Sequence, residues 1–410
     1  MRVLLVGSGG REHALAWALA RSPRLTALHA APGNPGIARL GTCHPVRARD
    51  AEGLLDLSRS LSADLVVIGP ETPLVDGLGD LLRHAGIAVF GPGAGAARIE
   101  GSKTFAKEVM AAAGVPAART LDMPAAPCVV KTDGLAAGKG VVVCHTEREL
   151  AAGLELVGAL GGDIVVEELL EGPEVSLLAL CDGLEAVALP PTQDFKRAFD
   201  GDMGPNTGGM GSYAPVPGID AVDVDELLGL VHRPVLAELA RRGSPFVGTL
   251  FAGLMLTAAG PRVLEFNCRF GDPETQSLLP LLDGDLLEAL AAAAAGELAG
   301  SSIAATADAA VTVVLAAGDY PAAGDVGVPI AGIEAAERTG ALVFHAGTAL
   351  AGGRVVANGG RVLNITATGG TVRAAREAAY AAADLVSWEG CRRRDDIALA
   401  AARGGTVRIR

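Results

Sequence analysis

The sequence is poor in aromatic residues and in long apolar runs. Only 3% of its 410 residues are aromatic, while 50% are hydrophobic and 55 are glycine. The apolar residues are thus mostly small, which favours closely packed helices and tight turns over disorder. No stretch of about 18 uninterrupted apolar residues occurs, so no transmembrane helix is expected. The apolar run at residues 3–6 is too short for a signal peptide, and we expect a cytoplasmic protein with no membrane partner.

Positive charge is also scarce. Lysine and arginine total 34 against 47 acidic residues, which gives a formal net charge of −13. A groove for nucleic acid would need the opposite sign, so no nucleic-acid partner is expected. The six cysteines lie apart, with no CxxC pair and no cluster with histidine. We therefore expect buried free thiols in place of zinc ligands or disulfides.

Lysine is confined to five positions: 103, 107, 131, 139 and 196. Every other basic residue is arginine, so the remaining lysines are candidates for sites that need a compact, flexible charge. Lys107 fits an ordinary helix surface. The other four are predicted to belong to a functional site.

The chain length suggests roughly three domains. Residues 1–100 alternate short strands with helical patterns, which is the signature of a doubly wound parallel sheet. Strands are expected at residues 3–6, 25–30, 65–68 and 87–90, and a helix at residues 12–20. A further helix is expected from the N-cap Ser102 to Ala113, with Gly114 ending it.

Residues 117–188 have the pattern of a small inserted α+β module. Strands are predicted there at residues 128–132, 141–144, 164–168 and 175–181, with a helix near 147–158. Beyond them we expect a long polar loop, a helix near 221–242, and strands at 249–256 and 263–267. A link at residues 292–302 leads to a last α+β domain.

The motif GSGGREH at residues 7–13 follows the opening strand. Its glycines, Gly9 and Gly10, let backbone N–H groups approach a phosphate. A dinucleotide-binding domain would also carry an acidic residue after its second strand, but residues 31–34 read APGN, which disfavours that function. The turns at Asn34 and Glu71 should lie beside this loop. Glu71 there suits a ribose hydroxyl or an amine, or is only a turn residue.

The stretch VVKTDGLAAGKGVVV at residues 129–143 lacks the spacing of a P-loop. It predicts a strand–loop–strand flap whose glycines and lysines close over a triphosphate, with Lys131 facing the same cavity. A mobile surface hairpin is the alternative.

In the connector at residues 165–176, backbone groups could meet an adenine edge and a carboxylate could accept ribose hydroxyls. The alternative is that its acidic residues are simply solvated.

The strongest motif is VLEFNCRFGDPETQ at residues 263–276. Glu265 and Asn267 alternate with apolar residues, so both point to one face of a strand. Two oxygen ligands suit Mg²⁺ held between protein and triphosphate. Arg269 follows on the same face, able to neutralise a phosphoryl group or an acyl phosphate.

The glycine-rich stretch at residues 192–215 is too long for a structureless linker, and loops of this kind are usually functional. Asp194, Lys196 and Asn206 are its candidates for touching substrate or nucleotide phosphates.

Together these segments resemble the ATP-grasp superfamily and, within it, the phosphoribosylamine–glycine ligase family. The likeness covers nearly the whole chain, and GSGGREHALAW, GPETPLV, GPNTGGMG and LEFNCRFGDPETQ are among the matching segments. It implies an α/β and α+β multidomain protein with an ATP-grasp fold. A Rossmann-like N-terminal domain would span residues 1–100 and the ATP-grasp core 101–300, with a lid subdomain at about 117–188. A C-terminal α+β domain would span 301–410.

The resemblance also implies an activity: an ATP-dependent ligase joining glycine to 5-phosphoribosylamine through glycyl phosphate, in the second step of de novo purine synthesis. The protein would act as a monomer or small homo-oligomer. Implied ATP-binding residues are Lys103, Lys131, Gly138, Lys139, Gly140, Glu167, Leu170 and Glu174. The lysines would hold phosphates, the backbone of Glu167 and Leu170 the adenine, and Glu174 the ribose. Implied metal ligands, for Mg²⁺ or Mn²⁺, are Glu265 and Asn267, and implied catalytic residues are Arg269, Lys139 and Lys131.

The chain departs from the family pattern in a few places. Phe195 stands where histidine is usual, and Ala398 and Ala400 stand where glycine and arginine typically follow the Asp-Ile pair. The last two bear on contacts between the C-terminal domain and substrate. The alternatives are another ATP-grasp carboxylate–amine ligase and a non-catalytic nucleotide-binding protein.

Overall fold

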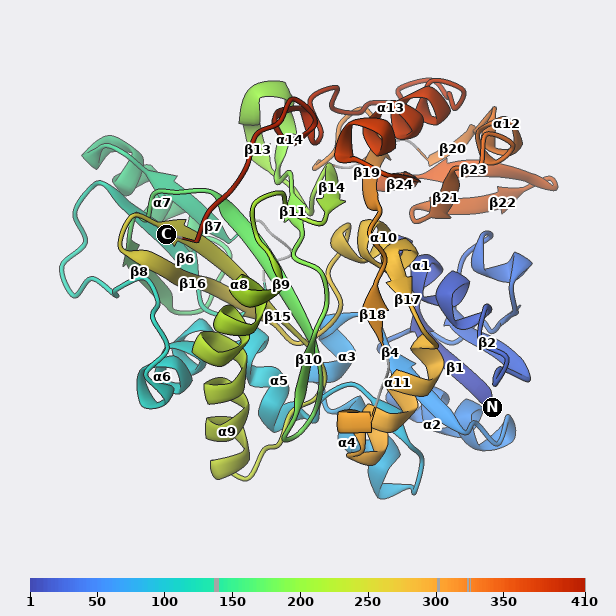
Figure 1. Cartoon of the computed structure of the whole chain (residues 1–410), viewed down its shortest axis with the longest axis horizontal. Helices are drawn as coiled ribbons and strands as arrows, with labels where there is room; N and C mark the ends of the chain where they lie inside the picture. The colour runs from blue at the N-terminus through green and yellow to red at the C-terminus, as the bar shows by residue number, and fades with distance from the viewer. Residues whose placement is uncertain (136–139, 301–302, 323, 325, 410) are drawn as a thin grey trace.

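A computed structural model describes residues 1–135, 140–300, 303–322, 324 and 326–409 (Figure 1). In this view the lid lies at the left, the N-terminal domain at the lower right and the C-terminal strands at the upper right. The first sheet is entirely parallel, with strand order β3-β2-β1-β4-β5. Its strands are β1 (Arg2–Gly7), β2 (Ala27–Pro32), β3 (Thr42–Cys43), β4 (Leu65–Ile68) and β5 (Val89–Phe90). The predicted doubly wound sheet is confirmed.

The helices of this domain are α1 (Gly10–Leu19), α2 (Ala51–Ser60), α3 (Glu71–Val75) and α4 (Leu78–His84). Strand β1 lies between β2 and β4, so the three turns at its carboxyl end are neighbours. Gly33 N donates to Gly7 O and Gly69 N to Val6 O, each at 3.0 Å. The predicted proximity of these turns is therefore confirmed.

Two helices lead into the core, α5 (Ala94–Gly101) and α6 (Lys103–Ala113). Ser102 caps α6, because its Oγ accepts from Phe105 N at 3.1 Å. Gly114 ends the helix in the left-handed region at φ +68°, where a side chain would be strained. Both predicted ends of this helix are confirmed.

The lid holds a three-stranded sheet in the order β7-β6-β8, covered by one helix. Its elements are β6 (Cys128–Thr132), β7 (Val141–Cys144), α7 (Glu147–Gly158) and β8 (Ile164–Glu168), at the predicted positions. The fourth predicted strand, β9 (Glu174–Asp182), does not belong to this sheet but pairs with β15 in the core. Residues 175–181 are buried at every position, so this strand needs cover on both faces, which the small lid sheet does not provide.

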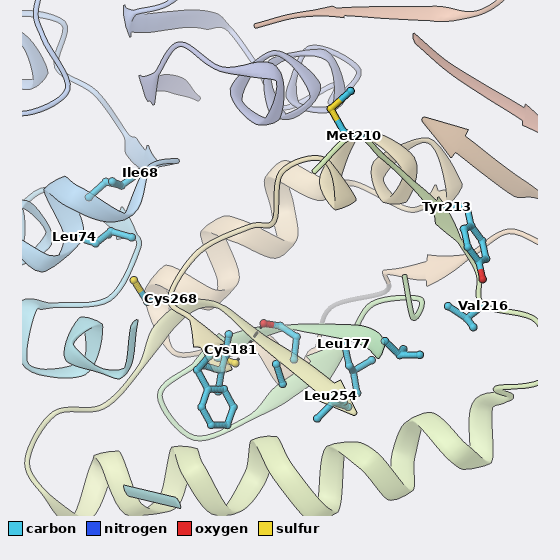
Figure 2. Packing of buried hydrophobic residues seen from close by; sticks show 14 of the residues in the cluster. Ile68, Leu74, Leu177, Cys181, Met210, Tyr213, Val216, Leu254 and Cys268 are labelled. Atoms are coloured by element: carbon cyan, nitrogen blue, oxygen red, sulfur yellow. Dashed lines mark hydrogen bonds between the residues drawn. The ribbon is translucent and has the colours of Figure 1, made fainter. Parts of the chain in front are cut away.

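The core sheet is antiparallel, in the order β10-β9-β15-β16, and adds β10 (Ala186–Ala188), β15 (Val247–Thr257) and β16 (Gly260–Asn267). Figure 2 shows Leu177, Cys181 and Leu254 packed in this core.

The helix predicted near 221–242 is divided into α8 (Ala221–Leu227), a π-helical turn η3 (Leu228–His232) and α9 (Arg233–Arg241). Pro234 lacks an N–H at the start of α9, which accounts for the altered turn before it. Helices α10 (Glu274–Leu278) and α11 (Leu286–Ala295) follow.

The C-terminal sheet has the order β11-β14-β19-β24-β21, so it draws strands from both sides of residue 300. Its strands are β11 (Gln193–Asp194), β14 (Gly211–Ala214), β19 (Ala309–Ala316), β21 (Leu342–His345) and β24 (Arg361–Gly369). Between β11 and β14 lies a hairpin that the sequence did not reveal, β12 (Arg197–Phe199) and β13 (Met203–Asn206). A second sheet joins β20 (Val326–Pro329), β22 (Thr348–Ala351) and β23 (Arg354–Asn358), and the helices are α12 (Ile333–Glu337), α13 (Val372–Ala383) and α14 (Leu399–Ala402). A two-stranded ladder pairs β17 (Leu282–Asp283) with β18 (Ala304–Ala305).

All six cysteines are free, and four of them are buried, as predicted; Cys43 and Cys391 are half-buried. Among the described residues, we find no helix with the length and hydropathy needed to cross a membrane.

Histidine His232 lies in the core behind β9 and is fully buried. Its Nε2 lies 3.2 Å from Leu177 O, and burial lowers its pKa from 6.5 to about 4. The folded protein therefore keeps this imidazole neutral at pH values where the unfolded chain protonates it. Since the unfolded state then binds more protons, this residue's contribution to stability falls as the pH drops below 6.5.

We predict that this buried histidine makes the protein acid-sensitive. Each pH unit below 6.5 should cost about 1.4 kcal/mol at this residue until the folded-state pKa is reached. The measurement is denaturant unfolding at pH 7 and pH 5 of the natural chain, of His232→Gln and of His84→Gln, which changes an exposed histidine. The stability difference between the natural chain and His232→Gln should shift by roughly 2 kcal/mol between the two pH values. A difference that is the same at both pH values would contradict the account.

Candidate functional site

The lid and the core meet at a cluster of lysines and carboxylates. Lys131 on β6 pairs with Glu167 on β8 at 2.6 Å and donates to Leu264 O at 3.0 Å. Lys107 pairs with the same carboxylate at 2.6 Å and is only 19% exposed, so it is not the ordinary surface residue that we expected. Burial lowers the pKa of Lys107, and the charge of Glu167 offsets part of this decrease. One carboxylate thus orients two cations at the base of the lid.

The backbone of Glu167 is already part of the sheet. Glu167 lies opposite Val129 of β6 on one side and opposite Thr120 on the other. The connector to β9 begins after Glu168, so Leu170 lies outside the paired strands. Of the two positions expected to meet an adenine edge, only Leu170 therefore lies in this unpaired connector.

Strand β16 presents the predicted polar face. Val263 and Phe266 are buried, whereas Glu265 and Asn267 are not, and the side chain of Glu265 is 38% exposed. Arg269 Nη2 donates to Asn267 Oδ1 at 3.5 Å, which places these two side chains on the same side. The sequence predicted that the carboxylate of Glu265, the amide of Asn267 and the guanidinium of Arg269 share one face, and this contact shows it for Asn267 and Arg269.

Lys196 joins this face to the connector at residues 165–176. Its ammonium group forms ion pairs with Glu174 at the start of β9 and, at 3.7 Å, with Glu265. Burial alone would lower the pKa of Lys196, but Glu174, Asp194 and Glu265 outweigh it and raise that pKa well above its ordinary value. Lys196 therefore stays charged between the carboxylates assigned to ribose and to metal.

Lysines also set the charge of Glu265. Burial tends to raise its pKa, yet Lys196, Lys131, Lys103 and Arg269 together hold it below the usual range. Lys103 itself, at the start of α6, donates from Nζ to Gly134 O at 3.1 Å. An ionised Glu265 is what a cation ligand requires.

Two other carboxyl groups near these cations have raised pKa values instead. Burial raises the pKa of Asp194 well above its ordinary value, although Lys196 opposes the shift. Burial likewise raises the pKa of Glu274, at the first turn of α10. Asp194 lies directly opposite Ser212, whose hydroxyl reaches Pro273 O at 2.8 Å, so β11 faces the start of α10.

Arg269 is held by carboxylates from the N-terminal domain and α5. It contacts Glu71 and Glu100, each at 3.2 Å, and these carboxylates keep its pKa above the ordinary value despite burial. Glu100 also accepts from Cys268 N at 2.8 Å. Glu71 therefore orients the predicted catalytic arginine.

The glycine loop after β1 packs tightly. A methyl group on Gly10 would lie 2.3 Å from Asn364 Nδ2 and 2.7 Å from Gln276 Nε2. Gly9 N donates to Glu12 Oε2 at 2.6 Å. These glycines thus permit close packing of α1 against the core and the C-terminal sheet.

Asn34 fastens this loop to its neighbours. Its Nδ2 donates to Ser8 O at 2.9 Å and to His345 O at 2.8 Å. Its Oδ1 accepts from Gly36 N and Ile37 N, both at 2.9 Å. Asn34, in the turn expected beside the glycine loop, therefore links the N-terminal domain to β21.

A cavity of about 390 Å³ opens beside these loops. It is lined by Ser8, Gly9, Gly33, Asn34, Asp272, Ala346, Gly347, Thr348, Asn358, Gly359, Gly360 and Arg361. Arg361 pairs with Asp272 at 3.2 Å and donates to Gly208 O at 2.6 Å, so it also touches the glycine-rich loop before β14. The cavity therefore combines exposed backbone, the hydroxyls of Ser8 and Thr348, and the guanidinium of Arg361 paired with the carboxylate of Asp272.

The other predicted residues are Asn206 and three residues of the lid loop. Asn206 on β13 reaches the lid, since its Nδ2 donates to Val141 O at 3.4 Å. Gly138 and Lys139 lie outside the described residues, and Gly140 accepts from Thr132 N at 2.9 Å.

Sequence reasoning missed Glu100, Glu274, Arg361 and the role of Lys107. Glu274 stands in the motif at residues 263–276 that had been singled out, and Arg361 follows the glycine pair at residues 359–360, so both could have been found in the sequence. The scarcity of lysine could have pointed to Lys107, whereas nothing in the sequence distinguishes Glu100 from other charged residues on helices, because its partners are distant along the chain.

The donor set on β16 fits a divalent metal ion bound together with phosphates. Glu265 and Asn267 offer two oxygen ligands on one face, and Mg²⁺ takes few protein ligands when phosphates complete its shell. Within the described residues, no group of three or more histidine, cysteine or acidic residues forms a self-contained metal site.

Comparison with known proteins covers nearly the whole chain. Residues 1–100, 101–275 and 310–400 match the N, ATP-grasp (A) and C domains of phosphoribosylglycinamide synthetase. A Streptomyces coelicolor protein named phosphoribosylamine--glycine ligase is 50% identical over 418 residues, covering 98% of this chain and 100% of that protein. A Rhizobium meliloti protein of the same name is 49% identical over 414 residues, covering 97% and 98%.

Solved structures give the same result. The crystal structure of phosphoribosylamine--glycine ligase from Thermotoga maritima matches with a TM-score of 0.84 at 36% identity, covering 97% of this chain and 100% of that chain. A biotin carboxylase domain from Hydrogenobacter thermophilus matches at 17% identity with a TM-score of 0.70, covering 95% and 91%, which shows the shared ATP-grasp fold alone. On these matches, made across all three parts of the chain, the protein belongs to the phosphoribosylglycinamide synthetase family.

Proposed function

We propose that the chain is the ATP-dependent ligase that joins glycine to 5-phosphoribosylamine, giving glycinamide ribonucleotide, ADP and phosphate. This is the second step of de novo purine synthesis, and we place it in the cytoplasm with the protein as a monomer or small homo-oligomer. The observation that carries the proposal is the face of β16, where Glu265 lies within 3.7 Å of Lys196 and Asn267 within 3.5 Å of Arg269. The family membership and the relatives' names support the choice of substrates.

We place the nucleotide between the lid and the core. Lys103 and Lys131, with Gly138, Lys139 and Gly140 of the lid loop, would hold its phosphates. Leu170 of the connector would offer backbone to the adenine, and Glu174 would accept the ribose hydroxyls. Glu174 starts β9 and pairs with Lys196, so ribose and phosphate contacts would be coupled through one lysine.

Glu265 and Asn267 would hold Mg²⁺ or Mn²⁺. Such an ion supplies charge neutralisation for the oxygens of a transferring phosphoryl group. The glycine carboxylate attacks the γ-phosphoryl group in line, which yields ADP and glycyl phosphate. Arg269, fixed by Glu71 and Glu100, adds a guanidinium that stabilises charge on the transferred phosphoryl group.

The second step joins the two substrates. The amine nitrogen of phosphoribosylamine attacks the acyl carbon of glycyl phosphate, and phosphate leaves. Closure of the lid would keep water from the acyl phosphate, which it would otherwise hydrolyse. Asp194, Lys196 and Asn206 lie on the segment that links this centre to the lid, and we retain them as substrate contacts.

The cavity beside Gly9 suits the phosphoribosyl group. It presents backbone from the glycine loops near Gly9 and Gly359, the hydroxyl of Thr348 and the guanidinium of Arg361. A planar guanidinium recognises phosphate oxygens in pairs. We place the 5-phosphate of phosphoribosylamine there, with its amine directed towards Arg269.

We predict that phosphate release from Mg-ATP requires both glycine and freshly made phosphoribosylamine. The assay omits each substrate in turn and replaces glycine with alanine. Release with another acid or amine would retain the ATP-grasp chemistry and overturn the named reaction. Mg-ATP binding without release under any condition would favour a non-catalytic nucleotide-binding protein.

We predict that Glu265→Gln weakens the metal site, because a neutral amide replaces the charged oxygen ligand. The Mg²⁺ concentration that gives half-maximal rate should rise at least about tenfold, with a parallel series in Mn²⁺ as a comparison. Glu155→Gln, which changes an exposed residue of α7, is the matched control. An unchanged metal requirement would remove Glu265 from the metal site.

We predict that Arg361→Gln raises the KM for phosphoribosylamine by about tenfold to a hundredfold, since a charge-assisted hydrogen bond to phosphate is worth roughly 1.5–3 kcal/mol. The KM for Mg-ATP should change little, because Arg361 lies at the cavity beside Gly9 and not between the lid and the core. Arg354→Gln, at an exposed position on β23, serves as the control. The reverse pattern, with only the KM for Mg-ATP raised, would exclude a phosphoribosyl site at Arg361.

A further inference from the structure

The segment at residues 391–397 packs against the β12–β13 hairpin, although nearly two hundred residues separate them along the chain. Figure 1 shows α14, which follows this segment, drawn next to β13. Of the two, the hairpin carries residues assigned to the site, whereas the C-terminal segment carries none. The contact between them therefore needs its own explanation.

Arg394 is the centre of this contact, and only 1% of its side chain is exposed. Its guanidinium donates to both oxygens of Asp396 at 2.7 Å, to Arg197 O at 3.0 Å and to Asp202 at 2.8 Å. It also lies over the ring of Phe195, with Cζ 5.1 Å from the ring centroid. Arg394 thus contacts the hairpin at its base, along β12 and at its turn.

Backbone groups extend the same contact. Gly201 N donates to Asp396 Oδ2 and Asp395 N donates to Asp200 Oδ1, both at 2.8 Å. Each side of the interface therefore offers one carboxylate to a backbone N–H of the other. Such reciprocal bonds fix position more closely than a single ion pair does.

The C-terminal segment is itself rigidly attached to the helix α13. Tyr380 OH donates to Arg394 O at 2.8 Å and accepts from Ile397 N at 3.1 Å. Arg376 Nε donates to Ile397 O at 2.8 Å. The segment is thus fastened to α13 at Arg394 and at Ile397, so its contacts tie the hairpin to the C-terminal domain.

The base of the hairpin carries Lys196. Thr207 donates to Lys196 O from both its N, at 2.7 Å, and its Oγ1, at 2.8 Å. A shift of the hairpin would therefore move the lysine that pairs with Glu174 and Glu265.

We propose that Arg394 is a positioning residue for the ligase: it fixes the β12–β13 hairpin so that Lys196 stays between Glu174 and Glu265. The proposal rests on the proposed function for its kinetic consequences, but its binding consequence does not. The guanidinium is needed because it donates hydrogen bonds to the hairpin backbone at Arg197, to Asp202 and to Asp396 at once. A lysine offers no planar fork and would keep only part of this contact.

The first experiment compares the natural chain with Arg394→Gln, Arg394→Lys and Arg393→Gln. Arg393 is a matched control, because it pairs with Asp384 and Asp395 and has no contact with the hairpin among the described interactions. Calorimetric titration with Mg-ADP should show a dissociation constant raised about tenfold in Arg394→Gln, less in Arg394→Lys and unchanged in Arg393→Gln. This readout does not depend on which acid and amine are joined.

Steady-state kinetics add a second readout. The KM for Mg-ATP should rise and kcat should fall in Arg394→Gln, whereas the KM for phosphoribosylamine should stay within about twofold. A general loss of structure would instead change every constant and the circular dichroism spectrum. If the natural chain shows no glycine-dependent turnover, the proposed function fails, and the Mg-ADP titration still decides the role of Arg394.

Because Arg394 is buried, its replacement could unfold the protein. The variant Asp200→Asn with Asp202→Asn avoids this, since both side chains are exposed and asparagine tolerates the left-handed conformation of residue 202. It removes the two carboxylate charges that the hairpin contributes to the contact and should raise the Mg-ADP dissociation constant by about threefold.

A double-mutant cycle with Lys196→Met completes the test. If Arg394 acts through Lys196, Arg394→Gln should weaken Mg-ADP binding far less in the Lys196→Met background than in the natural chain. Additive effects, or unchanged Mg-ADP binding in folded Arg394→Gln and in the Asp200/Asp202 variant, would overturn the proposal.

Discussion

The site depends on charges that neutralise one another. Lys131 is paired with Glu167, and Lys196 is paired with Glu174 and Glu265. Removing such charges from water without a partner would cost several kcal/mol per group, so the cations needed for phosphates are folded together with carboxylates. In the proposed function, a triphosphate and its metal ion would exchange partners within the cluster, with the lysines turning to phosphate and Glu265 to the metal. Little net charge has to be created or removed.

This constraint explains why the site draws on all parts of the chain. Arg269 follows β16, but the carboxylates that orient it come from α3 and α5. Asn34 fastens the N-terminal loops to His345, and Arg361 of β24 reaches Gly208. Each contact fixes one domain relative to another. The relative placement of the domains is therefore part of the site and does not merely support it.

Local features were predictable from sequence, and pairings between distant segments were not. The ends of α6 were foreseen because Ser102 and Gly114 carry local capping chemistry, and the face of β16 because alternation is a local property. The strand β9 was foreseen as a strand but assigned to the wrong sheet, since its partner β15 lies some seventy residues further on. Lys107 was misjudged for the same reason: its partner Glu167 is on another element. Asn34 was placed in the correct region, but its contacts with Ser8 and His345 depend on three-dimensional packing.

The departures near the C-terminus illustrate the difference between a motif and its physical role. Ala398 adopts φ +57°, a conformation that costs a residue with a Cβ roughly 1–2 kcal/mol and that glycine adopts without strain. Ala398 nonetheless adopts this conformation, because the contacts of Arg394 with Asp396 and of Ile397 with Tyr380 hold the preceding residues in place. What the segment retains is its hold on the β12–β13 hairpin and, through it, on Lys196. The C-terminal domain can therefore serve the reaction through Arg361 at the cavity and through this hairpin, without a contact from residues 398 or 400.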